Sequence, residues 1–150
     1  MRGLTRRDAL MLGLGTAAVT LAGPEAVRAT PSEAEAEIAK FTGGKPAAQG
    51  RISIDLPEIA ENGNAVPLSL AIESPMTPAD HITDVLVVAD GNPNPRVAAF
   101  RFSPLSGRAE ASTRIRLAAT ENVIVVARTG NGEFYTARKE VKVTIGGCGG

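Results

Sequence analysis

The sequence ends in a cysteine surrounded by glycines. Cys148 is the single cysteine of the 150 residues and lies third from the end. Its four glycine neighbours are Gly146, Gly147, Gly149 and Gly150. Because glycine lacks a Cβ atom, they give the thiol a narrow backbone with many accessible conformations. At about 3.3–3.6 Å per extended residue, the tail can carry the thiol roughly 10 Å beyond Ile145. This pattern predicts a flexible arm that presents a nucleophile to another protein.

Nothing beside Cys148 in the sequence activates its thiol. No cationic side chain adjoins it, and the terminal carboxylate lies two residues away. A free thiol has a pKa of about 8.5, so a few per cent of it is the nucleophilic thiolate near neutral pH. We therefore expect partner active sites to activate it. Two simpler interpretations compete: a small buried hydrophobic side chain, or a disulfide to a second chain.

The other residues that could do chemistry are sparse. His81 is the single histidine, and we expect it to border a loop. One cysteine excludes an internal disulfide and a multi-thiolate metal site. The sequence has neither a Walker-type loop nor a histidine cluster with metal-ligand spacing. We therefore expect no catalytic centre, no metal site and no cofactor in this chain.

Charge and composition argue against a nucleic-acid partner. The chain has 16 basic and 16 acidic residues, so it has no excess of positive charge for a phosphate backbone. Four phenylalanines, one tyrosine and no tryptophan offer little surface for stacking bases.

Residues 1–29 have the pattern of an export signal. Arg6 and Arg7 precede an uncharged run of 15 residues, 9–23, and the segment ends in Val27-Arg28-Ala29. A basic start, an apolar stretch and a small-residue cleavage site are typical of a secretory signal peptide, and the paired arginines favour the twin-arginine pathway. We predict cleavage after Ala29 and a periplasmic location. The apolar run is shorter than the roughly 20 residues of a membrane span, so we expect none.

Residues 30–50 are predicted to form a short helix and a linker. Thr30 or Ser32 can cap the helix, each with a glutamate three residues further on, and Pro31 is tolerated in the first turn. Gly43-Gly44 is expected to end the helix.

From residue 51 the apolar residues recur with a period of two, which is typical of half-buried strands. Asn131-Gly132 is a strong hairpin pattern, and Pro67 predicts an edge position or a bulge near the start of its strand. About seven strands at short intervals favour an immunoglobulin-like antiparallel β-sandwich over residues 51–145, followed by the arm 146–150. The predicted strands are 51–56, 65–73, 82–90, 97–102, 109–117, 122–128 and 134–145, the last as one long strand or a pair of strands.

The tail and four internal stretches resemble the SoxY family, the sulfur-carrier subunit of the periplasmic Sox thiosulfate-oxidising system. The tail from Val141 to Gly150 is similar to that family's terminal Gly-Gly-Cys-Gly-Gly motif, which is highly specific. The internal stretches are 56–63 (LPEIAENG), 73–77 (ESPMT), 92–95 (NPNP) and 112–117 (STRIRL). Together they span nearly all of the mature chain, and the twin-arginine leader fits the family as well.

The resemblance implies a covalent sulfur carrier and not an enzyme. In the family, a SoxAX-type c-type haem enzyme joins thiosulfate oxidatively to the terminal cysteine. A SoxB-type di-manganese hydrolase then releases sulfate, and a sulfane dehydrogenase oxidises the sulfur that remains. The covalent role maps to Cys148 and the flexible arm to its four glycine neighbours. Haem and manganese are expected in the partner enzymes only, and a SoxZ-like β-sandwich subunit is the expected heterodimer partner.

A function of another class explains the same tail. A secreted structural or adhesive β-sandwich would use Cys148 to form a disulfide-linked dimer, since export places the thiol in an oxidising compartment. Both functions predict an exposed, reactive cysteine. Only the carrier needs the glycines for its work, because the arm has to enter the narrow active sites of partner enzymes.

Overall fold

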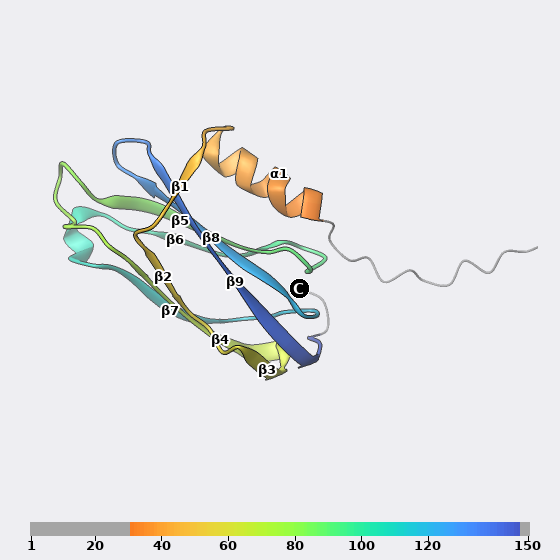
Figure 1. The fold of residues 1–150 in the computed structure, drawn as a ribbon. Helices are drawn as coiled ribbons and strands as arrows, with labels where there is room; N and C mark the ends of the chain where they lie inside the picture. Colours follow the sequence, from red (N-terminus) through yellow and green to blue (C-terminus); the bar gives the residue numbers. More distant parts are fainter. Residues whose placement is uncertain (1–30, 148–150) are drawn as a thin grey trace, which may run out of the picture.

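The computed structural model describes residues 31–147. Two β-sheets pack face to face, and one helix lies on the outer face of the larger sheet (Figure 1). The predicted export signal, with Arg6, Arg7 and the cleavage site after Ala29, lies outside the described residues. Cys148, Gly149 and Gly150 also lie outside them. The start of the helix and the end of the last strand lie toward the same end of the sandwich (Figure 1).

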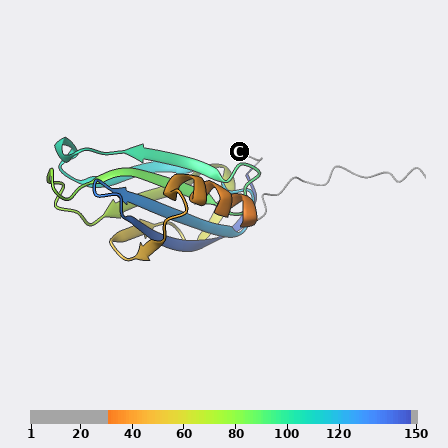
Figure 2. The same ribbon diagram turned by 90° about the horizontal axis from the view of Figure 1, so that it is seen from above.

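Helix α1, Pro31–Thr42, confirms the predicted N-terminal helix. It ends where Gly43 and Gly44 take positive φ angles of 63° and 77°, which glycine adopts without a steric cost. The helix lies over the strands of the larger sheet (Figure 2). Its apolar residues pack there in two small clusters, and the rings of Phe41 and Phe134 meet edge to face at a centroid distance of 5.9 Å. This contact fixes the helix on the sheet.

The larger sheet has the strand order β1-β9-β8-β5-β6. Its strands are β1 (Ala47–Gln49), β5 (Ile82–Ala89), β6 (Arg96–Arg101), β8 (Glu121–Thr129) and β9 (Phe134–Ile145). The β8–β9 hairpin turns at the predicted position, where Gly132 has a φ of 79°. A further short strand, β3 (Ile59–Asn62), pairs with the last residues of β9. Both β1 and β3 run parallel to β9, whereas the other pairs of this sheet are antiparallel.

The smaller sheet has the antiparallel order β2-β4-β7. Its strands are β2 (Ile52–Asp55), β4 (Val66–Ile72) and β7 (Ala109–Ile115). Two short 3₁₀ turns, η2 (Gly63–Ala65) and η3 (Pro104–Ser106), lie in the connections. The seven predicted strands are all present, and the predicted β-sandwich is confirmed.

The prediction that Pro67 marks an edge strand or a bulge is wrong for its strand as a whole, because β4 is the middle strand of the smaller sheet and pairs in regular register. The reason that a proline fits lies in the length of β2. Strand β2 pairs with Ser69 to Ile72 only, so at Pro67 the described chain supplies a paired neighbour on the β7 side alone. The position therefore resembles an edge locally.

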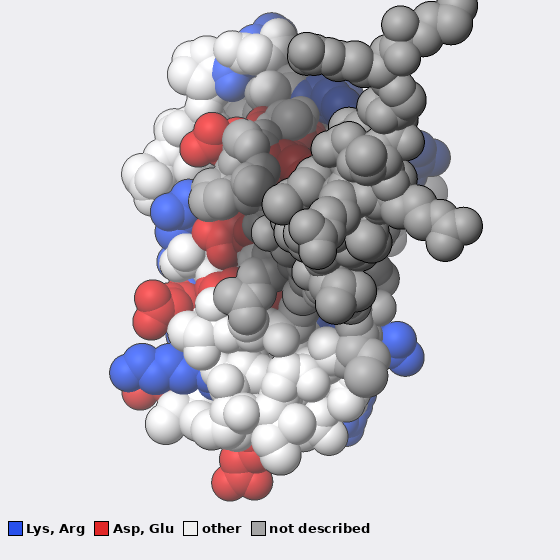
Figure 3. All heavy atoms as spheres, turned by 90° about the vertical axis from the view of Figure 1, so that its right-hand side faces the viewer, with Lys and Arg blue, Asp and Glu red and all other residues white. Residues whose placement is uncertain are grey.

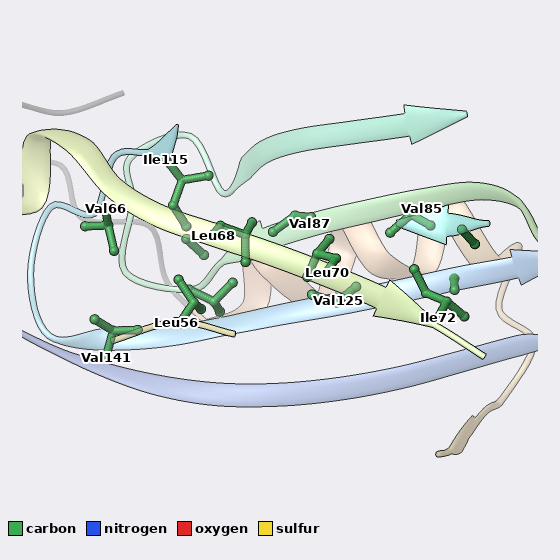
Figure 4. Packing of buried hydrophobic residues seen from close by; sticks show 14 of the residues in the cluster. Leu56, Val66, Leu68, Leu70, Ile72, Val85, Val87, Ile115, Val125 and Val141 are labelled. Atoms are coloured by element: carbon green, nitrogen blue, oxygen red, sulfur yellow. The ribbon is translucent and has the colours of Figure 1, made fainter. Parts of the chain in front are cut away.

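The core lies between the two sheets and consists of small aliphatic side chains. Leu68 and Leu70 of β4 point from one sheet toward Val85, Val87 and the neighbouring residues of the other (Figure 4). Strands β5 and β8 are buried on both faces, because α1 covers the side that turns away from this core. Burial of each such side chain stabilises the fold by about 1.5–3 kcal/mol. Within residues 31–147, no helix is long and apolar enough to cross a membrane.

Candidate functional site at the root of the C-terminal arm

Strand β9 carries the chain to one end of the sandwich. Its pairing with β8 ends at Val141, opposite Glu121, and β3 accompanies it from Lys142 to Ile145. The Lys142 amide donates to the Glu58 carbonyl at 2.9 Å. The last residues of β9 are thus held by β3 at the point where the cysteine-bearing tail begins.

The first two glycines of the tail lie against the body of the protein. We call Gly146 and Gly147 the arm root. The Gly147 amide donates to the Leu117 carbonyl at 2.9 Å, and the Leu117 amide donates to the Gly63 carbonyl at 2.8 Å. Three chain segments that are distant in the sequence therefore meet through their backbones, in an arrangement that we call the socket.

The socket has no room for a Cβ atom at Gly63 and Gly146, and it is tight at Gly147. A Cβ atom on Gly63 would lie 2.2 Å from the Leu117 carbonyl oxygen and 2.7 Å from the Gly147 nitrogen. One on Gly146 would lie 2.1 Å from the Ala118 carbonyl oxygen, and one on Gly147 would lie 3.0 Å from the Gly63 carbonyl oxygen. The sequence suggested that the glycines of the tail serve flexibility from Gly146 onward. In the structure, the first two also allow the close approach of backbones.

Two buried polar side chains hold the backbone of residues 116–118, the segment against which the arm root lies. Asn92 is 1% exposed, and its amide group donates to the Arg116 carbonyl at 2.7 Å and accepts from the Ala118 amide at 2.8 Å. Glu121 is 4% exposed and accepts from the amides of Gly91 at 2.7 Å and Ala118 at 3.0 Å. Together they fix the segment on which the arm root rests, since each buried polar group here has a partner.

Burial of Glu121 raises the pKa of its carboxyl group, because a buried charge loses its hydration. The three amides that point at the carboxylate, from Gly91, Ala119 and Ala118, act in the opposite direction, and the nearby Asp90 adds to the increase. The side chain therefore works as a hydrogen-bond acceptor at a site where its charge is costly.

The predicted site residues fall into two groups. Gly146 and Gly147 are described and form the arm root, whereas Cys148, Gly149 and Gly150 lie outside the described residues. His81 borders a loop, as predicted: its Nδ1 atom lies 3.0 Å from the Thr77 carbonyl oxygen. Its own carbonyl accepts from the Gly130 amide, so it lies where the β8–β9 hairpin turns, which we call the hairpin end of the sandwich. Among residues 31–147, no group of three or more His, Cys, Asp and Glu side chains is placed to hold a metal ion.

Sequence reasoning treated Asn92 and Gly63 as turn residues and did not single out Glu121. One signal connects two of them. The stretches 56–63, 92–95 and 112–117, which carried the resemblance to a known family, all reach the socket, through Gly63, Asn92 and Leu117.

Two comparisons with known proteins indicate the same family. The chain matches the family described as sulfur oxidation protein SoxY over residues 38–148. It is similar to the solved structure of the sulfur carrier protein SoxY from Chlorobium limicola f thiosulfatophilum, with 38% identity and a TM-score of 0.65, covering 77% of this chain and 100% of that one. Comparison with curated protein sequences gives no match.

More distant solved structures share the fold alone. The superoxide reductase (neelaredoxin) from Ignicoccus hospitalis has 20% identity and a TM-score of 0.55, and the match covers 78% of this chain and 95% of that one. A putative superoxide reductase from Thermotoga maritima has 16% identity and a TM-score of 0.52, with 69% and 89% covered. At such low identity the likeness says nothing about chemistry.

Proposed function

This chain belongs to the SoxY family of sulfur oxidation proteins, and on that basis we propose that it is a periplasmic carrier that holds thiosulfate-derived sulfur covalently on Cys148. Family membership and the likeness to a solved sulfur carrier support the carrier role. The observation that carries the proposal is the position of the single cysteine. It follows directly after an arm root that the fold delivers to one end of the sandwich.

The first proposed step forms a sulfur–sulfur bond. The Cys148 thiol and thiosulfate join as Cys–S–S–SO₃⁻, with the release of one proton and two electrons, which a haem-containing partner enzyme accepts. Water then cleaves the bond between the outer sulfur and the SO₃ group. This step releases sulfate and one proton, and it leaves a persulfide, Cys–S–SH, for oxidation by a sulfane dehydrogenase.

The body of the protein contributes placement and not catalysis in this scheme. Partner enzymes supply the oxidising and hydrolysing groups, including the manganese of the hydrolase. A narrow arm suits this division, because glycines beside the sulfur let it enter a confined active site. We also propose that a SoxZ-like β-sandwich subunit forms a heterodimer with this chain, and that a twin-arginine signal ending at Ala29 exports it.

The test is the intact mass of the mature protein, purified without reductant from cells given thiosulfate. We expect an adduct that reductant removes and that peptide mapping places on Cys148 alone. A Cys148→Ser variant prepared in the same way is the matched control and carries no adduct. Free thiol together with an inter-chain disulfide, and nothing else, would instead support a dimerising structural domain.

A further inference from the structure

Three arginines line a hollow beside the socket. Arg96 begins β6, Arg114 lies near the end of β7, and Arg116 directly follows that strand. The hollow has a volume of about 270 Å³ and opens between these two strands. Asn92 and Asn94 complete its polar lining, and no aspartate or glutamate contributes to it.

The positive charge of this hollow is not neutralised by hydrogen-bonded partners. Within the described residues, the guanidinium groups of Arg114 and Arg116 form no ion pair and no hydrogen bond. Arg96 differs, because it also lines a hollow on the outer face of the larger sheet and interacts electrostatically with the Glu37 carboxylate of α1. A second group of arginines, on the outer face of the larger sheet, differs in this respect. There Asp84 pairs with Arg128 at 2.5 Å and with Arg101 at 3.6 Å. Cations without partners beside a groove are what an anion requires.

The arm root points toward the hollow. Gly146 lies against Ala118 and Gly147 against Leu117, so the arm root runs antiparallel to this segment. The residue that precedes Leu117 is Arg116, and consecutive Cα atoms are about 3.8 Å apart. Asn92 connects the two features, because its side chain holds the Arg116 and Ala118 backbones and also lines the hollow.

The sandwich end that carries these features is seen in Figure 3. Acidic and basic side chains both appear on its visible part, so this end as a whole does not have charge of one sign. An anion on the arm therefore gains from a specific group of cations and not from a general positive field.

We propose that the hollow is a resting site for the anionic sulfur group on the arm, in which Arg114 and Arg116 bind the terminal SO₃⁻ group while the arm root occupies the socket. This inference rests on the proposed carrier function. It adds a binding site on the carrier itself for the cargo between visits to partner enzymes. A docked sulfonate is also less accessible to thiols that would cleave its sulfur–sulfur bond.

The test uses the full mature chain, loaded chemically so that no partner enzyme is needed. Tetrathionate reacts with the Cys148 thiolate to give Cys–S–S–SO₃⁻ and releases thiosulfate. Methyl methanethiosulfonate gives a neutral adduct, Cys–S–S–CH₃, and releases methanesulfinate. The two adducts differ at the group that the hollow is proposed to bind.

Nitrogen–proton NMR spectra of both adducts give the first measurement. We expect the anionic adduct to shift the backbone and guanidinium signals of Arg114 and Arg116 relative to the methyl adduct. The signals of Arg108, an exposed arginine at the opposite end of β7, should not move. Added salt should reduce the shifts, because the site is open to solvent. Identical arginine signals in the two adducts would overturn the proposal.

Cleavage of the anionic adduct by dithiothreitol, a neutral reductant, gives the second measurement. The double variant Arg114→Gln/Arg116→Gln should lose the adduct about three- to tenfold faster than the wild type, as expected for the loss of one or two charge-assisted contacts at an exposed site. Arg108→Gln is the matched control and should leave the rate unchanged. Equal rates in the double variant and the wild type would overturn the proposal.

A third measurement separates tethered from free anions. Thiosulfate is added to the methyl adduct, in which Cys148 is blocked. If it shifts the arginine signals at millimolar concentration as strongly as the tethered adduct does, the hollow binds free anions and the resting-site proposal fails. Every measurement here uses a chemically prepared adduct. A failure of the resting-site proposal is therefore distinct from the absence of an adduct in cells, which would instead reject the carrier function.

Discussion

Glycines are crowded in different ways at the two ends of the sandwich, the hairpin end and the end where the socket lies, which we call the arm end. At the hairpin end, a Cβ atom on Gly130 would lie 2.6 Å from the ring of His81, which is a side chain that can turn away. At the arm end, a Cβ atom on Gly63 or Gly146 would meet carbonyl oxygens at 2.2 or 2.1 Å. Backbone atoms held in a hydrogen-bonded segment cannot move aside at low cost. Whether a glycine can be replaced therefore depends on whether a side chain or the backbone lies next to it. At the arm end it is the backbone, so replacement is more costly there.

The buried polar groups of the two ends bond over different distances in the sequence. Asn92 and Glu121 are almost fully buried at the arm end, and both hold backbone groups of other chain segments. At the hairpin end the buried Thr129 hydroxyl bonds to Glu133 within the same turn, and Asn131 is exposed. Long-range hydrogen bonds of buried side chains thus fix the backbone where the cysteine-bearing tail begins, whereas the hairpin end relies on hydrogen bonds within its turn.

The largest effect is expected from Gly63→Ala. The added methyl group has to displace the Leu117 carbonyl and the Gly147 amide, so we expect a loss of about 1–3 kcal/mol in the free energy of unfolding. The hydrogen-exchange protection of the Gly147 amide should fall at the same time. Denaturant unfolding and amide exchange measure the two effects. Gly130→Ala is the matched control, with a smaller loss and unchanged protection at Gly147; equal effects of the two variants would erase the distinction between the ends.

A second variant, Asn92→Ala, removes two hydrogen bonds and leaves the Arg116 carbonyl without its side-chain partner. A buried group without a partner costs about 1–3 kcal/mol, and part of this cost is avoided here because the Ala118 amide also donates to Glu121. We expect a loss of about 1–2 kcal/mol, measured by urea unfolding. Asn131→Ala should change stability by less than about 0.5 kcal/mol. A result in the reverse order would contradict the role given to Asn92.

The pH dependence of stability isolates Glu121. Its pKa in the folded protein is raised by burial above the ordinary value of 4.5, so its contribution to stability is complete below that pH and is lost as the pH rises through the folded-state pKa. Glutamine at this position does not titrate. The free energy of unfolding of Glu121→Gln, minus that of the wild type, should therefore increase from about pH 4 to about pH 7. Urea unfolding at both pH values measures it, and a difference that stays flat or falls with pH would contradict the assignment.

The smallest effect on stability is expected beyond the socket. Gly149→Val should leave the free energy of unfolding within about 0.5 kcal/mol of the wild type and abolish thiosulfate oxidation with the partner enzymes. Gly147→Val is expected to abolish turnover as well, but it also crowds the Gly63 and Leu117 carbonyl oxygens and so unseats the arm root. The pair separates entry into partner enzymes from docking on the body. Wild-type oxidation by Gly149→Val would reject the argument that the arm has to be narrow.

The strands were predictable because their apolar alternation is local. The predicted bounds 134–145 match β9 to the residue, and of the two alternatives, one long strand or a pair, the structure has the single strand. The paired glycines ended α1 as expected. Strands β1 and β3 were missed because each has only three or four residues and pairs in parallel with β9, a long-range contact that leaves no local pattern. The error at Pro67 has a similar origin, since the length of the neighbouring β2 decides whether a proline fits.

The site was predictable in part. The cysteine and its glycines stand out from composition and spacing alone. The socket does not, because Gly63, Asn92 and Glu121 are distant in the sequence and each has an ordinary local explanation as a turn or strand residue. Only the crossing of backbones at the sandwich end shows that Gly146 and Gly147 are held, and only the fold brings Arg114 and Arg116 to a hollow beside them.

The pairing of β9 has a mechanical consequence. Under the proposed function, a partner enzyme that draws the arm into its active site would pull on the C-terminal end of this strand. The hydrogen bonds that join β9 to β8, β1 and β3 lie across the strand axis. A pull along that axis loads them together in shear, so the strand resists extraction as a unit, and the single Gly147–Leu117 bond is the first to yield. The anchorage lets the tail be tugged repeatedly while the sandwich stays folded.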